Sequence, residues 1–181
     1  MKILVLESSG NKKGSSNMLA DEFIRGAKEN NHEITVFDVF TANICPCLGC
    51  GHCGMAGPCV LKDDYETKLK SMIKSADLLV FVMPVYYYNW PSQLKVVIDR
   101  FYSFTGELTA MHKKSILLAA AWDDTDSVFA IVDAYYQKIC DYMQFTDLGK
   151  VLGKGCGTPG MTKNSIYPKE AHLLGKSIEN D

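Results

Sequence analysis

Short runs of consecutive apolar residues alternate along the chain with segments of helical periodicity. Three of these runs, at 3–6, 78–83 and 116–121, are apolar throughout. Such runs are typical of parallel strands that are buried on both faces. Weaker strand signals cover residues 33–39 and 150–155. The pattern therefore predicts five strands.

Apolar residues between these strands recur at helical spacing. The clearest stripe has positions i, i+3, i+4, i+7 and i+8, occupied by Leu94, Val97, Ile98, Phe101 and Tyr102. Similar stripes predict helices over 20–27, 65–76 and 128–139, and a last helix near 169–179. Each predicted strand is thus followed by a helix.

This alternation predicts the fold class α/β, with a doubly wound, five-stranded parallel sheet and helices on both of its faces. No repeat, low-complexity tract or linker interrupts the 181 residues, so we expect a single domain over 1–181 with a cysteine-rich loop at 45–59. Ligands of such sheets bind beyond the carboxyl ends of the strands, where the strand order reverses. The loops that follow the strands are therefore the candidates for function.

Composition excludes several classes of protein. Apolar residues make up 47% of the chain and charged residues 22%, as in ordinary globular proteins. The net charge is −2, and no basic block indicates a nucleic-acid partner. No apolar run approaches the roughly 20 residues of a membrane-spanning helix, and the first residues hold too few apolar positions for a signal peptide. We expect a cytoplasmic protein without a nucleic-acid or membrane partner.

The loop after the first predicted strand is rich in hydroxyl and amide groups and leads directly into a helix. It reads SSGNKKGSSN over 8–17 and matches neither the dinucleotide fingerprint nor the P-loop. Backbone N–H groups and the helix dipole favour an anion at such a position, so neutral side chains can hold a monophosphate without a lysine. The candidate residues are Ser9, Asn11, Ser15, Ser16 and Asn17. The alternative is that Ser16 or Asn17 only caps the helix.

The loop after the third predicted strand, PVYYYNWP at 84–91, places aromatic residues between two prolines. A large planar ring system can stack on such a surface. The candidate residues are Pro84, Val85, Tyr86, Tyr87, Tyr88, Asn89 and Trp90, with Trp122 after the fourth strand as a further edge. An aromatic mini-core and a subunit contact are the alternatives.

These loops resemble those of the NADPH-dependent FMN reductase family of flavodoxin-like proteins. SSGNKKGSSNMLA resembles the phosphate loop of that family, PVYYYNWPSQLKVVIDRF its flavin-ring loop and next helix, and IYPKEAHLLGKSI its C-terminal helix. Gly10 and Asn11 stand where the family usually has Pro-Arg, so this loop lacks the arginine beside the phosphate.

The resemblance implies a flavodoxin-like fold that binds FMN, with the phosphate on the first loop and the ring on the second. It implies an oxidoreductase that uses NAD(P)H as co-substrate, reduces a small-molecule or protein acceptor and forms a homodimer or homotetramer. Because the cofactor carries the chemistry, we expect no catalytic acid or base from the protein. The alternative is a flavodoxin-like electron carrier without turnover of its own.

Four cysteines lie within the thirteen residues CLGCGHCGMAGPC at 47–59. Clustered cysteines in a cytoplasmic protein indicate metal or redox chemistry rather than disulfides. The compact C-x2-C-x2-C-x5-C motif, formed by Cys47, Cys50, Cys53 and Cys59, resembles that of the iron–sulfur flavoprotein branch of the family. Four thiolates suit a [4Fe–4S] cluster or zinc, and free or redox-active thiols are a third possibility.

Overall fold

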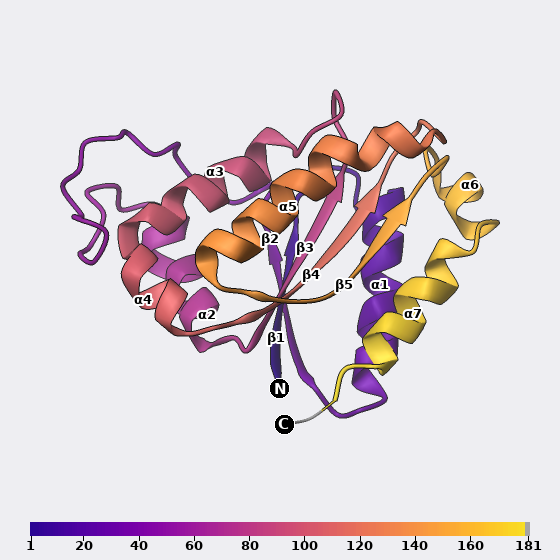
Figure 1. Ribbon diagram of the computed structural model, residues 1–181, viewed down its shortest axis with the longest axis horizontal. Coiled ribbons are helices and arrows are strands. Elements are labelled where there is room, and N and C mark those ends of the chain that lie inside the picture. The colour runs from indigo at the N-terminus through magenta and orange to yellow at the C-terminus, as the bar shows by residue number, and fades with distance from the viewer. Residues whose placement is uncertain (180–181) are drawn as a thin grey trace.

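The computed structural model describes residues 1–179 and contains five parallel strands in the order β2-β1-β3-β4-β5 (Figure 1). Their bounds are Lys2–Glu7 (β1), Glu33–Asp38 (β2), Leu78–Pro84 (β3), Lys114–Ala120 (β4) and Thr146–Gly153 (β5). This confirms the predicted doubly wound sheet. The fifth strand begins at Thr146, earlier than residue 150. Residues 180–181, which the predicted domain includes, lie outside the described part of the chain.

Helices connect successive strands, and two more helices follow the last strand. They are α1 (Ser15–Lys28), a π-helical turn η1 (Tyr65–Leu69) continued by α2 (Lys70–Ser75), α3 (Ser92–Arg100), a 3-10 turn η2 (Phe101–Phe104) continued by α4 (Thr105–Ala110), a 3-10 turn η3 (Asp126–Phe129) continued by α5 (Ala130–Met143), α6 (Pro159–Lys163) and α7 (Tyr167–Lys176). The short helices α4 and α6 have no counterpart among the sequence predictions. Within residues 1–179, no helix has both the length and the apolar character needed to cross a bilayer.

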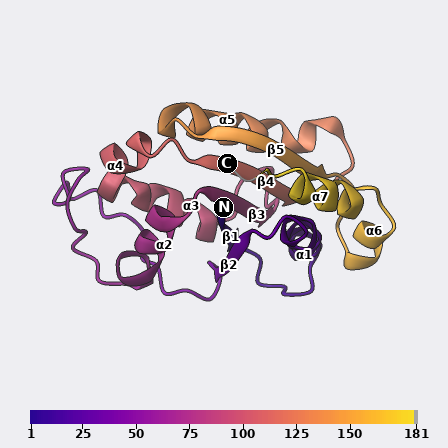
Figure 2. The same ribbon diagram turned by 90° about the horizontal axis from the view of Figure 1, so that it is seen from below.

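The sheet separates two helical layers (Figure 2), with α2 to α5 on one face and α1 and α7 on the other. Strand β3 contributes alternate residues to the two cores because successive side chains of a strand point to opposite faces. Leu79 and Phe81 pack toward α3 and α5, whereas Leu78 and Val80 pack toward α1. Both faces of the central strands are therefore buried, which explains their unbroken apolar sequence.

Helices α1 and α7 cross where each has a glycine. A Cβ atom on Gly26 would lie 2.0 Å from the carbonyl oxygen of His172, and one on Gly175 would lie 2.1 Å from that of Phe23. The two backbones are in direct contact, so neither position has room for a side chain. This crossing holds α1, whose N-terminus forms part of the candidate site.

Candidate functional site

A cavity of about 340 Å³ lies at the carboxyl edge of β1, β3 and β4, where the strand order reverses. Loops after four of the strands line it, through Ser9, Asn11, Gly14, Ser15, Ser16, Pro84, Val85, Tyr86, Ala120, Trp122, Cys156, Gly157 and Pro159. The phosphate-type loop and the aromatic loop thus meet around one space, as the sequence predicted. This is the position at which doubly wound sheets bind their ligands.

A larger hollow of about 540 Å³ lies at the opposite, amino edge of the sheet. The buried ammonium group of Lys113 lies there and donates to the carbonyl oxygens of Lys74 and Ala76, at the end of α2. Lys74 itself forms an ion pair with Glu107. Lys113 therefore braces the amino edge of the sheet, whereas the loops with candidate ligand-binding residues lie at the carboxyl edge.

The N-terminus of α1 opens into the 340 Å³ cavity without a capping side chain. Gly14 occupies the N-cap position, no side-chain hydrogen bond caps the helix, and the first turn holds no acidic residue. The alternative that Ser16 or Asn17 is the cap is therefore wrong. The hydroxyl oxygen of Ser15 is buried and has no hydrogen-bond partner among the described residues. Unpaired N–H groups and an unpaired hydroxyl at one helix end make a site for an anion.

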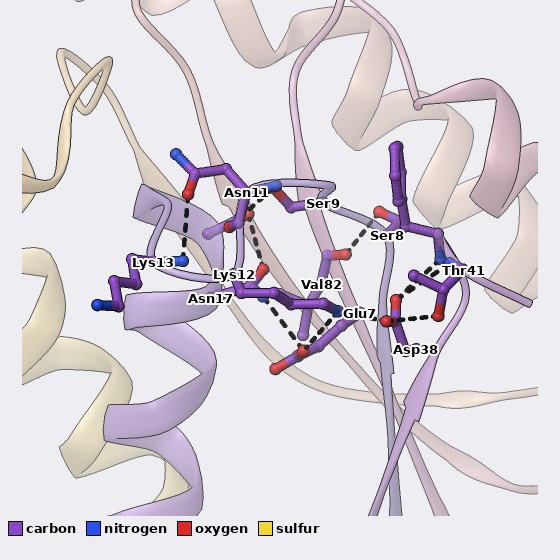
Figure 3. Close-up of polar contacts among 12 residues, drawn as sticks. Glu7, Ser8, Ser9, Asn11, Lys12, Lys13, Asn17, Asp38, Thr41 and Val82 are labelled. Carbon is purple, nitrogen blue, oxygen red and sulfur yellow. Dashed lines mark hydrogen bonds and ion pairs between the residues drawn. The ribbon is translucent and has the colours of Figure 1, made fainter.

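A polar network lies directly beneath this loop (Figure 3). Glu7 and Asp38 face each other across the ends of β1 and β2, and the ammonium of Lys12 lies 3.8 Å from Glu7 and 2.7 Å from Asp38. Burial raises the pKa of Glu7, which Lys12 lowers only in part. Burial would also raise the pKa of Asp38, but Lys12 and Thr41 hold it below its usual value. The positive charge of Lys12 is thus engaged by the two carboxylates.

Asn17 belongs to this network. Its side-chain amide donates to Glu7 at 3.2 Å, and Figure 3 shows it directed to that carboxylate. The loop above is braced by hydrogen bonds of its own, from the Asn11 N–H to Ser9 Oγ at 3.2 Å and from the Lys13 N–H to Asn11 Oδ1 at 3.2 Å. Asn17 therefore braces the loop from below and does not line the cavity.

The aromatic loop is a tight hairpin whose side chains point in different directions. Tyr86 and Asn89 exchange two backbone hydrogen bonds of 3.1 Å each, and the intervening Tyr87 and Tyr88 have φ values of 48° and 62°. Tyr86 lines the cavity, whereas Tyr87 at the tip is 100% exposed. Trp90 is turned into the core, where its indole N–H donates to a carbonyl of α5 at 3.2 Å. The four aromatic rings of this loop therefore do not form one common surface.

Trp122 forms the wall of the cavity that adjoins the loop between β5 and α6. A Cβ atom on Gly157 would lie 2.1 Å from the Trp122 ring, so the indole rests against the glycine backbone. The ring is 70% exposed, and Tyr86 is 53% exposed. Both aromatic walls are thus accessible to a planar ligand.

The structure divides the predicted cofactor residues into two groups. Those that line the cavity are Ser9, Asn11, Ser15, Ser16, Pro84, Val85, Tyr86 and Trp122, whereas Asn17, Tyr87, Tyr88, Asn89 and Trp90 do not. Sequence reasoning missed Gly14, at the start of α1, and Ala120, at the end of β4. It also missed Cys156, Gly157 and Pro159, which complete the lining. The sequence feature that could have indicated the last three is the glycine-rich turn after the fifth strand, because this turn lies at the same carboxyl edge as the other loops.

The cysteine-rich loop lies at one side of the molecule, next to α3 and α4 (Figure 1). Its four motif cysteines line one small pocket of about 20 Å³, together with Leu48, Val60, Leu61 and Tyr102. Gly49, Gly51 and Gly54 have φ values of 64°, 69° and 55°, the left-handed conformation that glycine adopts most easily. Within residues 1–179, none of the cysteines forms a disulfide.

The donor set of this pocket fits an iron–sulfur cluster, because four thiols and a mainly apolar surround are what such clusters use. As the loop stands, however, no three His, Cys, Asp or Glu side chains in residues 1–179 lie close enough together to hold a metal ion. The pocket gathers the thiols in one place without the close spacing of a formed metal site.

Comparison with known proteins agrees with the observed fold. Residues 1–174 match the model of a family described as having a flavodoxin-like fold. The chain belongs to this flavodoxin-like family. The resemblance found in the two loops thus extends over almost the whole flavodoxin-like domain.

Its relatives include proteins named iron–sulfur flavoproteins. One from Archaeoglobus fulgidus is 26% identical over 181 residues, which is 99% of this chain and 80% of the relative. Another, from Methanocaldococcus jannaschii, is 31% identical over 100 residues, or 55% of this chain and 51% of the relative. The second match thus covers about half of each protein.

Solved structures share the fold at low sequence identity. An NAD(P)H:quinone oxidoreductase from Methanothermobacter marburgensis superimposes with a TM-score of 0.72 at 18% identity, over 99% of this chain and 96% of the other. An FMN-dependent NADH-azoreductase from Bacillus anthracis, in complex with FMN, has a TM-score of 0.70 at 18% identity, over 97% and 98%. At these identities the similarity establishes the fold.

Proposed function

We propose that this flavodoxin-like protein is an FMN-dependent NAD(P)H oxidoreductase. The observation that carries the proposal is the meeting, around one cavity, of an uncapped helix N-terminus and two accessible aromatic side chains. The first suits a phosphate and the second a planar ring, and FMN has both. The family, and the cofactor and activities named for proteins of the same fold, support the proposal.

In this proposal each wall of the cavity has a separate task. The N–H groups at the start of α1 and the Ser15 hydroxyl hold the phosphate, while Tyr86 and Trp122 stack on the ring. When bound, FMN supplies hydride acceptance from NAD(P)H and release of electrons one or two at a time. The protein itself binds and orients the ring and leaves one face accessible, so no acid–base side chain is required.

Titration of the apoprotein with FMN, followed by isothermal calorimetry, tests the binding step. Riboflavin, which lacks the phosphate, is the control and should bind at least 10-fold more weakly if the start of α1 holds that group. Addition of NADH or NADPH to the FMN complex should then bleach the flavin absorbance. Equal affinity for FMN and riboflavin would contradict the phosphate site, and FMN binding without NAD(P)H oxidation would favour an electron carrier.

We further propose that Cys47, Cys50, Cys53 and Cys59 hold a [4Fe–4S] cluster, which would supply one-electron transfer. Their common pocket and the names of the relatives support this. Iron and sulfide analysis of anaerobically purified protein tests it, with about four of each expected per chain. Zinc without sulfide would contradict the cluster. Alkylation of all four thiols in protein kept strictly anaerobic would contradict it as well.

The acceptor and the assembly remain predictions from the resemblance. We expect a cytoplasmic homodimer or homotetramer that reduces a small-molecule or protein acceptor. Light scattering at several protein concentrations measures the assembly, and NAD(P)H oxidation with quinones and other small acceptors measures the turnover.

A further inference from the structure

The cysteine-rich loop leaves the body of the protein and returns to it at one narrow neck. The Asn43 N–H donates to Asp64 at 2.9 Å, and the Asp64 N–H donates back to the Asn43 carbonyl at 3.0 Å. The Cys45 N–H donates to the Asp63 carboxylate at 2.8 Å. Hydrogen bonds between the outgoing and returning segments therefore close the loop.

Arg100, the last residue of α3, attaches this neck to the body of the protein. Its two terminal nitrogens donate to the two carboxylate oxygens of Asp63, at 2.5 and 3.1 Å. One of them also donates to the Cys45 carbonyl at 2.8 Å. A single guanidinium group thus contacts both the outgoing and the returning segment.

The attachment is buried. Arg100 is 1% exposed and Asp63 8% exposed, and the guanidinium lies over the ring of Tyr65 at 4.8 Å. Burial alone would raise the pKa of Asp63, but Arg100 and the N–H groups of Cys45 and Glu66 hold it below its usual value. The pair therefore stays ionised at neutral pH, and water does not compete for its hydrogen bonds.

The other end of α3 adjoins the aromatic loop, whose Tyr86 lines the cavity. This helix of nine residues begins at Ser92, directly after the aromatic loop, and spans about 13 Å at 1.5 Å per residue. Figure 1 shows α3 running from the aromatic hairpin to the side of the molecule that carries the cysteine-rich loop. This helix therefore connects the aromatic loop, which supplies one wall of the cavity, with the neck of the cysteine-rich loop.

We propose that Arg100 and Asp63 form a clamp that positions the cysteine-rich loop on α3 and so fixes its thiols relative to the cavity. The functional meaning rests on the proposed function, whereas the clamp itself acts in protein free of metal and flavin. Arg100 and Asp63 are positioning residues in this account. Loosening the clamp should release the loop and leave the cavity unchanged.

The first test is Arg100→Lys in the full chain without metal, followed by hydrogen exchange and mass spectrometry. Lysine keeps the positive charge, but its single ammonium group cannot reproduce the planar guanidinium, which donates to both carboxylate oxygens of Asp63 and to the Cys45 carbonyl. We expect peptides from 43–66 to exchange at least 10-fold faster, strands β1 and β3 to keep their protection, and the FMN dissociation constant to change less than 2-fold. The control is Asp99→Asn, which removes an exposed ion pair with Lys95 on the same helix. It should change neither the exchange rate over 43–66 nor the FMN dissociation constant.

The second test measures the loaded protein. After anaerobic reconstitution, Arg100→Lys should retain less iron and sulfide than wild type and give a broadened electron paramagnetic resonance spectrum on reduction. If reconstituted wild-type protein contains no iron, the cluster is refuted. The hydrogen-exchange measurement on metal-free protein would still test the clamp. Unchanged exchange over 43–66 would overturn the clamp. If Arg100→Lys does not fold, Asp63→Asn replaces it, and global unfolding of both variants would also overturn the proposal.

Discussion

Replacement of Gly157 by alanine should weaken FMN binding without unfolding the protein. The new Cβ would lie 2.1 Å from the Trp122 ring, and carbon atoms in contact lie about 3.5–4.0 Å apart, so the ring must move by roughly 1.5 Å. Because Trp122 is largely exposed, it can turn away from the cavity at little cost to the fold. The substitution therefore removes an aromatic wall while leaving the tryptophan in the chain.

The size of the effect follows from what that wall contributes. A stacked aromatic pair is worth about 0.5–1.5 kcal/mol, so the FMN dissociation constant should rise about 2- to 13-fold, with a change in melting temperature below about 2 °C. Isothermal calorimetry measures the affinity. Trp122→Ala should give a loss of the same size, and the double variant should lose no more than either single one, because both remove the same contact.

The matched control is Gly160→Ala, where a Cβ atom would meet no atom closer than 3.9 Å. It should bind FMN as the wild type does. Wild-type affinity in Gly157→Ala alongside weakened binding in Trp122→Ala would refute the reasoning. Losses that add in the double variant would refute it as well, since the two residues would then act independently.

Three further predictions follow from the packing and the charges. Gly26→Ala should destabilise the fold by about 1–3 kcal/mol, lowering the melting temperature by roughly 2–12 °C, because the α1–α7 crossing has no room for a methyl group. Gly106→Ala, with nothing within 4 Å of the new Cβ, should instead stabilise helix α4 by up to about 1 kcal/mol, and equal effects would contradict the crossing. Glu7 has a raised pKa in the fold, so its stabilising contribution is present at low pH and is lost as the pH rises through that pKa. Glu7→Gln should therefore raise the melting temperature at pH 7 but not at pH 4, and a gain of the same size at both pH values would contradict this. Trp90→Phe should cost about 1–2 kcal/mol by loss of the hydrogen bond to Val132 and of packing, while the FMN affinity stays within 2-fold; a larger loss of affinity would place Trp90 in the site.

Periodicity predicted the centre of the fold well and its edges less well. Strands β1, β3 and β4 are buried on both faces, so their sequences are apolar without interruption. The edge strand β5 begins with Thr146 and Asp147 and is only partly covered, so its first half gave no apolar signal. The short helix α6 depends on a local cap, in which the Thr158 hydroxyl accepts from a backbone N–H two residues after Pro159, and too few apolar positions mark it.

The candidate site shows the same division. The two loops could be assigned to one edge because parallel strands place their carboxyl ends together. The directions of individual side chains could not be assigned, because a turn of two residues sends Tyr86 into the cavity and Trp90 into the core. The position of Asn17 could not be assigned for a related reason, since its side chain bonds to Glu7 on the strand beneath the loop.

The turn at Tyr87 and Tyr88 has a consequence for how the chain balances stability against its other requirements. A left-handed backbone costs a side chain such as tyrosine about 1–2 kcal/mol per residue, or roughly 2–4 kcal/mol for both. Asn-Gly is the pair that such hairpin turns prefer. Asn-Gly at 87–88 would therefore give a more stable turn. The tyrosines lower the stability of the fold, but they place two phenol rings in solvent next to the cavity.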